Sequence, residues 1–335
     1  MKAAVFYEPL DVRIEQIEMP VIKKDDVLVK VKSASLCGTD VQIFKGESVC
    51  KSPIVLGHDF SGEVADVGSK VHNLSVGDRI CVQPVGYCGR CYYCRNGHQN
   101  LCAKGEWIGF ERNGGFSEYA LLKEYNILRI SEGVSHDEAA IIEPVALGLR
   151  TLNLIQPQIG NIIAIIGQGP IGLVHTQICK LAGLTVIGID LDLVKLELTK
   201  KYGADYVVNA SEKARALSEI LNLTSARGAD VTIEASGTQS GVDMASEITR
   251  PGGKIGQVGH GKGLRGPSIL LEKEFTIQYV ELSPLEYDTA LKLIGEKRID
   301  VRSLISKKIL LDELPENLNM IVDRKINPLK LIVNP

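Results

Sequence analysis

The sequence predicts an α/β protein of two domains, one rich in short β-strands and one built as a doubly wound parallel sheet. Up to about residue 145, short apolar runs are separated by Gly, Pro and Asp, which is typical of an irregular β-rich domain. From Asn161 onward, strand-like and helix-like segments alternate, as in a parallel sheet joined by crossover helices. The 335 residues are enough for two hydrophobic cores.

The expected domain boundaries follow this change of pattern. The first domain is predicted to comprise residues 1–146 and 287–335, and the second residues 147–286. Within the first domain we expect strands at Val27–Val31, Phe60–Val67 and Asp78–Val82, a helix at Glu143–Leu154 and a returning strand at Pro328–Val333. Pro144 suits the first turn of its helix, where the missing N–H has no partner to lose.

In the second domain, strands and helices are predicted to alternate along the chain. Its expected strands are Ile162–Ile166, Thr185–Ile189, Tyr206–Val208, Val231–Glu234 and Lys254–Val258, with helices at Ile171–Leu181 and Asp192–Lys201. A further helix at Tyr287–Glu296 is expected to return the chain to the first domain.

Composition excludes several classes of partner. The net charge is −3, the isoelectric point is near 6.1 and the chain has no basic block, so nucleic acid and anionic membrane surfaces are poor candidates. The first residues have no apolar signal core, and runs such as Ile162–Ile166 are too short to cross a bilayer. Eight cysteines without a secretion signal favour a reducing compartment, so we expect a cytoplasmic protein.

Four of these cysteines are closely spaced within a lobe at about residues 86–103. They are Cys88, Cys91, Cys94 and Cys102. Thiolates at this spacing can surround one ion, and four sulfurs leave no open position, so the pattern predicts a structural zinc. The alternatives are two disulfides, four unrelated core cysteines, or an iron–sulfur cluster, although the familiar cluster spacings differ from this one.

A glycine-rich turn follows the first strand of the second domain. Gly167 allows the tight turn, Gly169 lets the backbone approach a pyrophosphate, and Gly172 permits close packing of helix on strand. The helix that begins at Pro170 and Ile171 would face the phosphates with the positive end of its dipole. The sequence therefore predicts a Rossmann dinucleotide site, although glycines in an ordinary turn would look the same in isolation.

Asp190 ends the second strand of this domain, 18 residues after Gly172. A carboxylate there would bind the ribose hydroxyls of adenosine and repel a 2′-phosphate, and no arginine follows at 191 or 192, so NAD is favoured over NADP. Lys195 either lies along the adenosine or is an ordinary solvated lysine. Val258 belongs to the segment 257–261, which is expected to line the cofactor side of a cleft between the domains.

Three residues of the first domain could form a second metal site. Cys37 and the pair His58-Asp59 are each expected to end a strand beside a glycine. Thiolate, imidazole and carboxylate together would bind zinc with a position left for water or substrate. Taken singly, a buried thiol, a core histidine and a turn aspartate are equally ordinary readings.

At this point the chain resembles a known family, the zinc-containing medium-chain dehydrogenases/reductases, and within it the polyol (sorbitol-type) and threonine dehydrogenases. The likeness extends over essentially all of the chain. It rests, besides the cysteine lobe and the glycine turn, on Cys37-Gly38-Thr39-Asp40, Gly57-His58-Asp59, Val76-Gly77-Asp78-Arg79-Ile80, Gly114-Gly115-Phe116-Ser117-Glu118-Tyr119 and Glu143-Pro144-Val145-Ala146. It implies a GroES-like catalytic domain that carries the lobe, followed by the Rossmann domain.

The resemblance also implies roles for individual residues. Cys37 and His58 match ligands of a catalytic zinc, Asp59 matches a third or reserve ligand, and Glu143 matches a glutamate that binds the metal or holds its water. Thr39 matches the hydroxyl that relays the proton of the substrate alcohol.

The sequence departs from its relatives in three places. Asp59 is one methylene shorter than the usual glutamate, so direct ligation would need a backbone shift or a water. Gln42 stands where many relatives have a relay histidine, and an amide cannot take up a proton. Glu281-Leu282 occupies the region where sorbitol-type enzymes have an arginine, which puts sorbitol itself in doubt.

The implied reaction is the NAD-linked interconversion of a secondary alcohol of a polyol, cyclitol or sugar derivative and its ketone. Two zinc ions per subunit, a small-molecule substrate and a homodimer or homotetramer are expected. Alternatives are a threonine- or butanediol-type dehydrogenase, a zinc-free quinone or enoyl reductase, a catalytically idle NAD- and zinc-binding homologue, and a zinc-ribbon nucleic-acid binder, which the acidic balance disfavours.

Overall fold

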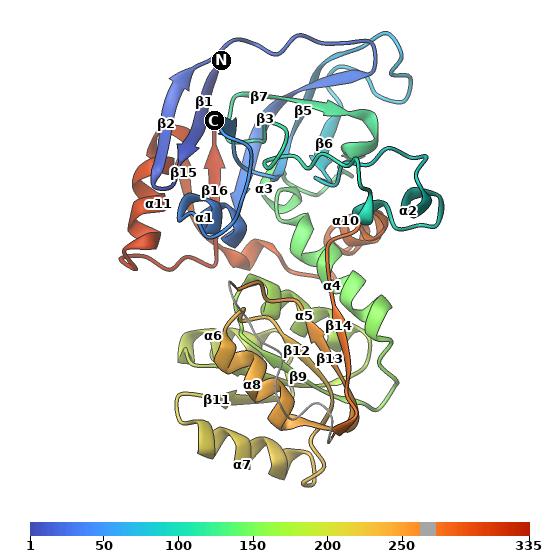
Figure 1. The fold of residues 1–335 in the computed structure, drawn as a ribbon, viewed down its shortest axis with the longest axis vertical. Helices are drawn as coiled ribbons and strands as arrows, with labels where there is room; N and C mark the ends of the chain where they lie inside the picture. The colour runs from blue at the N-terminus through green and yellow to red at the C-terminus, as the bar shows by residue number, and fades with distance from the viewer. Residues whose placement is uncertain (262–272) are drawn as a thin grey trace. The chain divides into compact units, whose positions relative to one another are not determined.

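The computed structural model describes residues 1–261 and 273–335, which form two compact units (Figure 1). One unit is Met1–Ala146 with Leu282–Pro335, and the other is Leu147–Glu281. Helix α4 (Ile142–Ile155) contains the first boundary. The sequence placed the chain's return to the first unit at residue 287, whereas the structure divides at Leu282.

The first unit is organised around strand β3 (Asp26–Leu36). The large sheet has the order β15-β16-β3-β5-β6-β8, and β7 also pairs with β3. These partners are β5 (Asp59–Val67), β6 (Arg79–Val82), β7 (Tyr119–Lys123), β8 (Ile127–Arg129), β15 (Ile305–Leu310) and β16 (Lys330–Asn334). Ser35 faces Asp59 across one pair, and Leu36 faces Leu331 across the other. The end of β3 therefore meets the start of β5 and the start of the last strand.

A small sheet, β2-β1-β4, completes the strands of this unit: β1 (Lys2–Glu8), β2 (Asp11–Gln16) and β4 (Ile54–Val55). Its helices are α1 (Gly38–Phe44), α2 (Tyr92–Arg95), α3 (His136–Ala139), α10 (Tyr287–Gly295) and α11 (Leu314–Val322). Together they enclose one apolar core.

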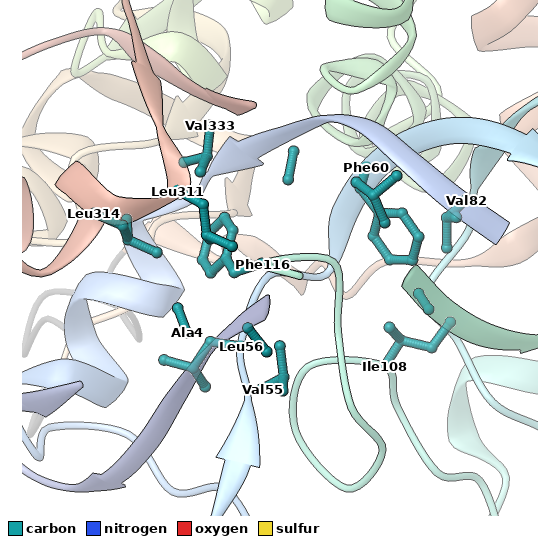
Figure 2. Close-up of a cluster of buried hydrophobic side chains, with 14 of the residues drawn as sticks. Ala4, Val55, Leu56, Phe60, Val82, Ile108, Phe116, Leu311, Leu314 and Val333 are labelled. Carbon is teal, nitrogen blue, oxygen red and sulfur yellow. The ribbon is translucent and has the colours of Figure 1, made fainter. Parts of the chain in front are cut away.

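The core of the first unit fixes the backbone just before His58. Phe60, Phe116 and Leu56 are at most 2% exposed, and Figure 2 shows them within one cluster of buried side chains. Gly57 has φ +89°, and a Cβ there would lie 2.9 Å from the Phe116 ring. Only glycine suits this position, because the backbone is left-handed and the ring occupies the space.

The second unit is a parallel sheet of order β11-β10-β9-β12-β13-β14. Its strands are β9 (Ile162–Ile166), β10 (Thr185–Asp190), β11 (Tyr206–Asn209), β12 (Ala229–Glu234), β13 (Thr249–Gln257) and β14 (Thr276–Tyr279). After α4, the α-helices in the described part of this unit are α5 (Pro170–Leu181), α6 (Leu193–Lys201), α7 (Lys213–Leu223) and α8 (Gln239–Ile248).

The strand order reverses between β9 and β12. Right-handed crossovers then place α5 and α6 on one face of the sheet and α7 and α8 on the other. Side chains of α7 and α8, including Ile220 and Ile248, share one buried cluster with the strands. In open sheets of this kind, ligands bind beyond the carboxyl ends of the strands at the point of reversal.

Among the described residues, none of the helices has both the length and the apolar character that a membrane span requires.

Candidate metal centres and nucleotide site

The four cysteines of the lobe converge on one point. The sulfurs of Cys88, Cys91, Cys94 and Cys102 all lie within 4.8 Å of one another. The Cys91 sulfur is 3.4 Å from that of Cys94 and 3.8 Å from that of Cys102. Four sulfurs bound tetrahedrally to zinc at about 2.3 Å would be about 3.8 Å apart, so the spacing fits this ion. All eight cysteines of the chain are free thiols, and the disulfide alternative is therefore wrong.

The environment of the four cysteines favours thiolates, and a bound cation would balance their negative charge. Backbone N–H groups of Arg90 and Cys91 point at the Cys88 sulfur and lower the pKa of that thiol to about 6. Burial, together with the neighbouring thiols, raises the pKa of Cys94 to about 11. A divalent ion among the sulfurs would offset this crowding of negative charge, so the residues present fit a structural zinc.

The second cluster forms where β3 ends and β5 begins. Cys37 follows β3, and Asp59 is the first residue of β5. The expectation that His58-Asp59 ends a strand was wrong, because His58 directly precedes β5. The Cys37 sulfur, a ring nitrogen of His58 and a carboxylate oxygen of Asp59 lie within 4.8 Å of one another. The cross-strand pairing of Ser35 with Asp59 places the two segments side by side.

One buried carboxylate, Asp40, ties these segments together. It accepts hydrogen bonds from the backbone N–H of Cys37 at 2.9 Å and of Gly57 at 3.2 Å, and it is fully buried. Its Oδ1 also faces Nδ1 of His58 at 3.6 Å. Asp40 is thus placed to orient the imidazole, as carboxylates beside metal-bound histidines do. Sequence reasoning gave it no role, although its capping-box spacing from Cys37 was a usable signal.

A buried lysine borders the same cluster. Lys330, the first residue of β16, is 4% exposed, and its ammonium lies 3.7 Å from Oδ2 of Asp59. Burial opposes its charge, but Cys37, Asp59 and Glu143 together raise the pKa of Lys330 above its ordinary value. Sequence reasoning missed this residue. The available signal was a single lysine in the otherwise apolar segment Pro328–Val333, which the sequence predicted to be a strand.

The electrostatics of the cluster attract positive charge. Burial opposes protonation of His58, but the negative charges of Asp59, Asp40 and Cys37 raise its pKa well above the ordinary value. Burial also raises the pKa of Asp59, and His58 and Lys330 lower it. A site with more acceptors than compensating cations suits a divalent metal.

Glu143 and Tyr287 adjoin this centre without belonging to the group of three. Glu143, on the first turn of α4, is buried. Its charge raises the pKa of Lys330 and, after burial, that of Tyr287. The structure therefore brings together Cys37, His58 and Asp59, while Glu143 lies at the edge of the cluster.

Several buried polar atoms of this region have no hydrogen-bond partner among the described residues. They are Nδ1 of His58, both carboxylate oxygens of Asp59, Oγ of Ser35 and the hydroxyl of Tyr287. Buried polar groups are nearly always satisfied by protein, water or a ligand. A zinc ion with its water would supply partners for the Asp59 carboxylate, whereas Nδ1 of His58 faces Asp40 and its Nε2 faces Asp59 at 3.9 Å. The thiolate–imidazole–carboxylate set is one that binds zinc. The residues fit a catalytic zinc.

Thr39, the expected proton relay, lies beside Cys37, and two aromatic side chains flank His58. Thr39 is half-buried, and its Oγ1 lies 3.7 Å from the Cys37 sulfur. Gln42 follows on the same short helix α1. Trp107 contacts Phe110 edge to face with ring centroids 6.3 Å apart, and Phe110 lies 5.5 Å from His58. Trp107 therefore belongs to an aromatic flank that borders the metal centre.

The glycine turn has the geometry that binds a pyrophosphate. Gly167 has φ +88°, and a Cβ on Gly172 would lie 1.9 Å from the Gly167 carbonyl oxygen. By contrast, a Cβ on Gly169 would meet nothing within 4 Å, so the turn is open at that point. Pro170 and Ile171 begin α5, whose N-terminus is capped by Gly169. Backbone amides and an open cradle fit a phosphate group.

Asp190 is held beside this turn. Its carboxylate accepts hydrogen bonds from the backbone N–H of Gln168 at 2.6 Å and of Asp192 at 2.9 Å. Gln168 is itself fully buried, and its amide oxygen accepts from hydroxyls on α5 and α6. Lys195 lies half-buried on the first turn of α6. Val258 follows β13, is 3% exposed and donates its N–H to the Glu234 carbonyl at 2.9 Å.

Comparison with known proteins identifies the family. Residues 23–132 match the alcohol dehydrogenase GroES-like domain, and residues 170–296 match the zinc-binding dehydrogenase family. A sorbitol dehydrogenase of Bacillus subtilis (strain 168) is 32% identical, with 100% of this chain and 97% of the relative covered. The chain belongs to the zinc-containing medium-chain dehydrogenases/reductases. The fold class expected from the sequence, a GroES-like domain with a Rossmann domain, is thereby confirmed for this dehydrogenase.

Solved structures agree with this assignment. The dehydrogenase matches galactitol-1-phosphate dehydrogenase from Escherichia coli with a TM-score of 0.92, at 32% identity and 100% coverage of both chains. It matches a putative zinc-binding dehydrogenase from Sinorhizobium meliloti 1021, bound to NADP, with a TM-score of 0.92 at 30% identity, covering 100% and 99% of the chains. The activity class is that of a zinc alcohol dehydrogenase.

Proposed function

We propose that this dehydrogenase interconverts a secondary alcohol of a polyol, cyclitol or sugar derivative and the corresponding ketone, with NAD as the hydride acceptor. The observation that carries the proposal is the cluster of Cys37, His58 and Asp59, with Lys330 behind it, at the end of β3. The similar sorbitol and galactitol-1-phosphate dehydrogenases act on polyols or their phosphates, which supports this class of substrate.

The residues of the cluster have separable tasks. Zinc bound there would polarise the alcohol oxygen and lower the pKa of its proton. Asp40 holds the backbone on which Cys37 and His58 sit. The Thr39 hydroxyl, whose Oγ1 lies 3.7 Å from the Cys37 sulfur, would accept the proton that the alcohol loses. Gln42 cannot take that proton further, so the relay must end in water or in a hydroxyl of the cofactor.

Asp190 supports NAD as the cofactor. Its carboxylate is fixed by two backbone amides beside the glycine turn, where it would face the ribose hydroxyls and repel a 2′-phosphate. The neighbouring residues are Leu191 and Asp192, which offer no cation for that phosphate. The NADP found in the Sinorhizobium relative makes this a point to test.

A substrate screen tests the reaction. Reduction of NAD would be followed at 340 nm with sorbitol, other polyols, cyclitols, polyol phosphates, butanediol and threonine. We expect turnover with at least one polyol-type alcohol and none without alcohol. Turnover of threonine or butanediol alone would reject the polyol class, and no turnover with any alcohol would reject the enzyme assignment.

A double variant tests the cofactor. Asp190→Ser with Leu191→Arg should shift the ratio of kcat/KM for NAD and NADP by about 100-fold or more toward NADP, because a repulsive charge is replaced by an attractive one. Glu197→Gln, on the exposed side of α6, is the matched control and should leave the ratio unchanged. An unchanged ratio in the double variant would remove Asp190 from the ribose contact.

We also propose that the subunits form a homodimer or homotetramer. β14 is an edge strand among the described residues of the parallel sheet, and Tyr279 on it is 69% exposed. Unpaired strand edges invite pairing with another chain. Light scattering after size exclusion measures the state directly, and a mass of one chain, 36.4 kDa, would contradict the proposal.

A further inference from the structure

A buried glutamate stands at the point where the strand order of the parallel sheet reverses. Glu234 is the last residue of β12 and is 0% exposed. It lies across from Ile166, the last residue of β9, in the register of the sheet. Glu234 is not among the residues that the sequence predicted to bind the cofactor or a metal.

The Glu234 carboxylate accepts hydrogen bonds from four donors. Ser236 supplies its backbone N–H at 2.9 Å and its hydroxyl, both to Oε1. Oε2 accepts from the backbone N–H of Gly237 at 3.2 Å and from Nε2 of Gln257 at 2.7 Å. A carboxylate has about four acceptor positions, so this group is fully used within the protein.

These bonds tie two loops to one residue. The first loop, which follows β12, contains Ser236 and Gly237. The second follows β13, and its Val258 and Gly259 donate their N–H groups to the Glu234 carbonyl at 2.9 and 2.8 Å. The Gln257 amide also donates to the Gly259 carbonyl at 2.8 Å, so one side chain bridges the carboxylate and the second loop.

The loops are packed too closely to move independently. A Cβ on Gly259 would lie 2.2 Å from the Gly237 nitrogen and 2.6 Å from Oε2 of Glu234. A Cβ on Gly167 would lie 2.7 Å from the Ser236 nitrogen, so the first loop also abuts the glycine turn. The carboxylate therefore sets the position of both loops relative to the turn that would hold the pyrophosphate.

The position in the sheet indicates which part of a cofactor these loops face. A dinucleotide spans the reversal point, with one nucleotide over each half of the sheet. The glycine turn and Asp190 lie on the half formed by β9, β10 and β11, where the adenosine would lie. The loops after β12 and β13 are thus left to face the second nucleotide, which carries the nicotinamide.

We propose that Glu234 is a positioning residue for the nicotinamide half of the cofactor, acting through the loops at 235–237 and 258–260. The inference rests on the proposed use of a nicotinamide dinucleotide. It adds that affinity for the nicotinamide depends on this carboxylate, whereas affinity for the ADP-ribose part of the cofactor does not.

The same strand provides a matched control. Asp230, near the amino end of β12, is 8% exposed and accepts hydrogen bonds from the Ile162 N–H at 2.9 Å and from the Arg250 side chain at 2.7 Å. Like Glu234, it is a buried carboxylate on β12 that holds neighbouring segments by hydrogen bonds. It lies near the amino end of the strand, whereas ligands bind beyond the carboxyl ends. A loss of stability alone should affect both residues alike.

The test compares two ligands in titration calorimetry on the full-length protein. NADH contains both nucleotides, and ADP-ribose lacks only the nicotinamide. Glu234→Gln turns one acceptor oxygen into a donor, whichever way the amide faces. We expect its Kd for NADH to rise about tenfold and its Kd for ADP-ribose to change by less than about twofold. Asp230→Asn should lower Tm and leave the ratio of the two Kd values as in the wild type.

A milder variant guards against failure to fold. Gln257→Met keeps the Glu234 carboxylate and removes the side chain that bridges it to the Gly259 carbonyl, and it should raise the Kd for NADH about threefold with the same selectivity. Equal weakening of NADH and ADP-ribose in both variants, or no weakening of either, would overturn the role of Glu234. A wild-type protein that binds neither ligand would overturn the proposed cofactor as well, so the two failures are distinguishable.

Discussion

Cys37 is the soft ligand of the candidate catalytic centre, and its replacement should separate metal chemistry from folding. Cys37→Ser keeps the shape of a half-buried side chain but removes the thiolate that zinc prefers. We expect kcat/KM to fall by at least about 1,000-fold, with Tm nearly unchanged. Activity assays with calorimetry measure both, and Cys50→Ser, at another half-buried free thiol, is the control. Retained activity in Cys37→Ser would remove Cys37 from the site.

His175 on α5 gives a prediction about pH. Its ring is fully buried, with Nδ1 donating to the Ile171 carbonyl at 2.7 Å and Nε2 lying 2.9 Å from the Thr151 hydroxyl. Burial, only partly offset by the carbonyl, lowers the pKa of His175 to about 4. The unfolded chain, with a pKa of about 6.5, therefore binds a proton between these values while the folded chain does not.

Stability should consequently be full above pH 6.5 and decline as the pH falls toward 4. This single group accounts for about 2 kcal/mol of lost unfolding free energy between pH 7.5 and pH 5. Urea titrations at the two pH values measure the loss, and His175→Gln should reduce it by that amount. The same pH dependence in variant and wild type would show that the folded imidazole titrates normally.

The site residues could be predicted from the sequence only in part, and the reason is physical. Cys37, His58 and Asp59 were singled out because a family resemblance linked them, and the pairing of β3 with β5 brings them together. Lys330 was missed because its strand lies about 270 residues away from His58 in the sequence and pairs beside β3 only in the fold. Motif spacing identifies ligands that are close together in the sequence, but it cannot identify residues that only the fold brings together.

At the scale of elements, two glycines of the glycine turn have different roles: Gly172 is required for packing of α5, and Gly169 leaves room for the ligand. Gly172→Ala would force its Cβ against the Gly167 carbonyl, so α5 must shift, and both Tm and NADH affinity should fall. Gly169→Ala meets nothing in the protein and should keep the wild-type Tm while NADH affinity falls about tenfold or more, because a methyl group would occupy the phosphate cradle. Thermal shift and NADH titration measure the pair. Unchanged NADH affinity in Gly169→Ala would place the pyrophosphate elsewhere.

The parallel sheet was the most predictable set of elements. Its buried strands are continuous apolar runs, and β9 to β12 lie within a few residues of the expected segments. Helices α7 and α8 were not assigned from the sequence. The strand β13 begins at Thr249, whereas the sequence predicted a start at Lys254. The prediction began too late because Gly252 and Gly253 do not suit a strand interior. Irregular pairing of this kind is set by neighbouring strands and not by local propensity.

For the whole molecule, the two thiolate-bearing clusters predict two zinc ions per chain. Elemental analysis of protein purified without chelators should give about two equivalents, and Cys37→Ser should give about one. Cys94→Ser should lose the other ion and also lower Tm, since Cys94 is the buried sulfur of a lobe with little apolar core of its own. A single equivalent in the wild type, held by the lobe, would leave the proposed catalytic centre without its metal.

The substrate is the property that the sequence predicted least. Predictions of fold class and family depend on patterns spread over hundreds of residues, so an error in one segment does not change them. Recognition of one alcohol depends on a few side chains around the bound substrate, and the positions of such side chains come from loop packing. A change of one methylene there alters binding by about 1–3 kcal/mol, which no pattern in the sequence reports.

The position of β16 has a consequence for how the chain is made. This strand lies between β3 and β15 and supplies Lys330 to the metal centre, although it follows the whole of the second unit in the sequence. A nascent chain will therefore contain all of the second unit while the first unit still lacks one of its inner strands. Until β16 has been synthesised, part of the β3 edge is open to wrong partners, and zinc insertion at that stage would find an incomplete set of neighbours.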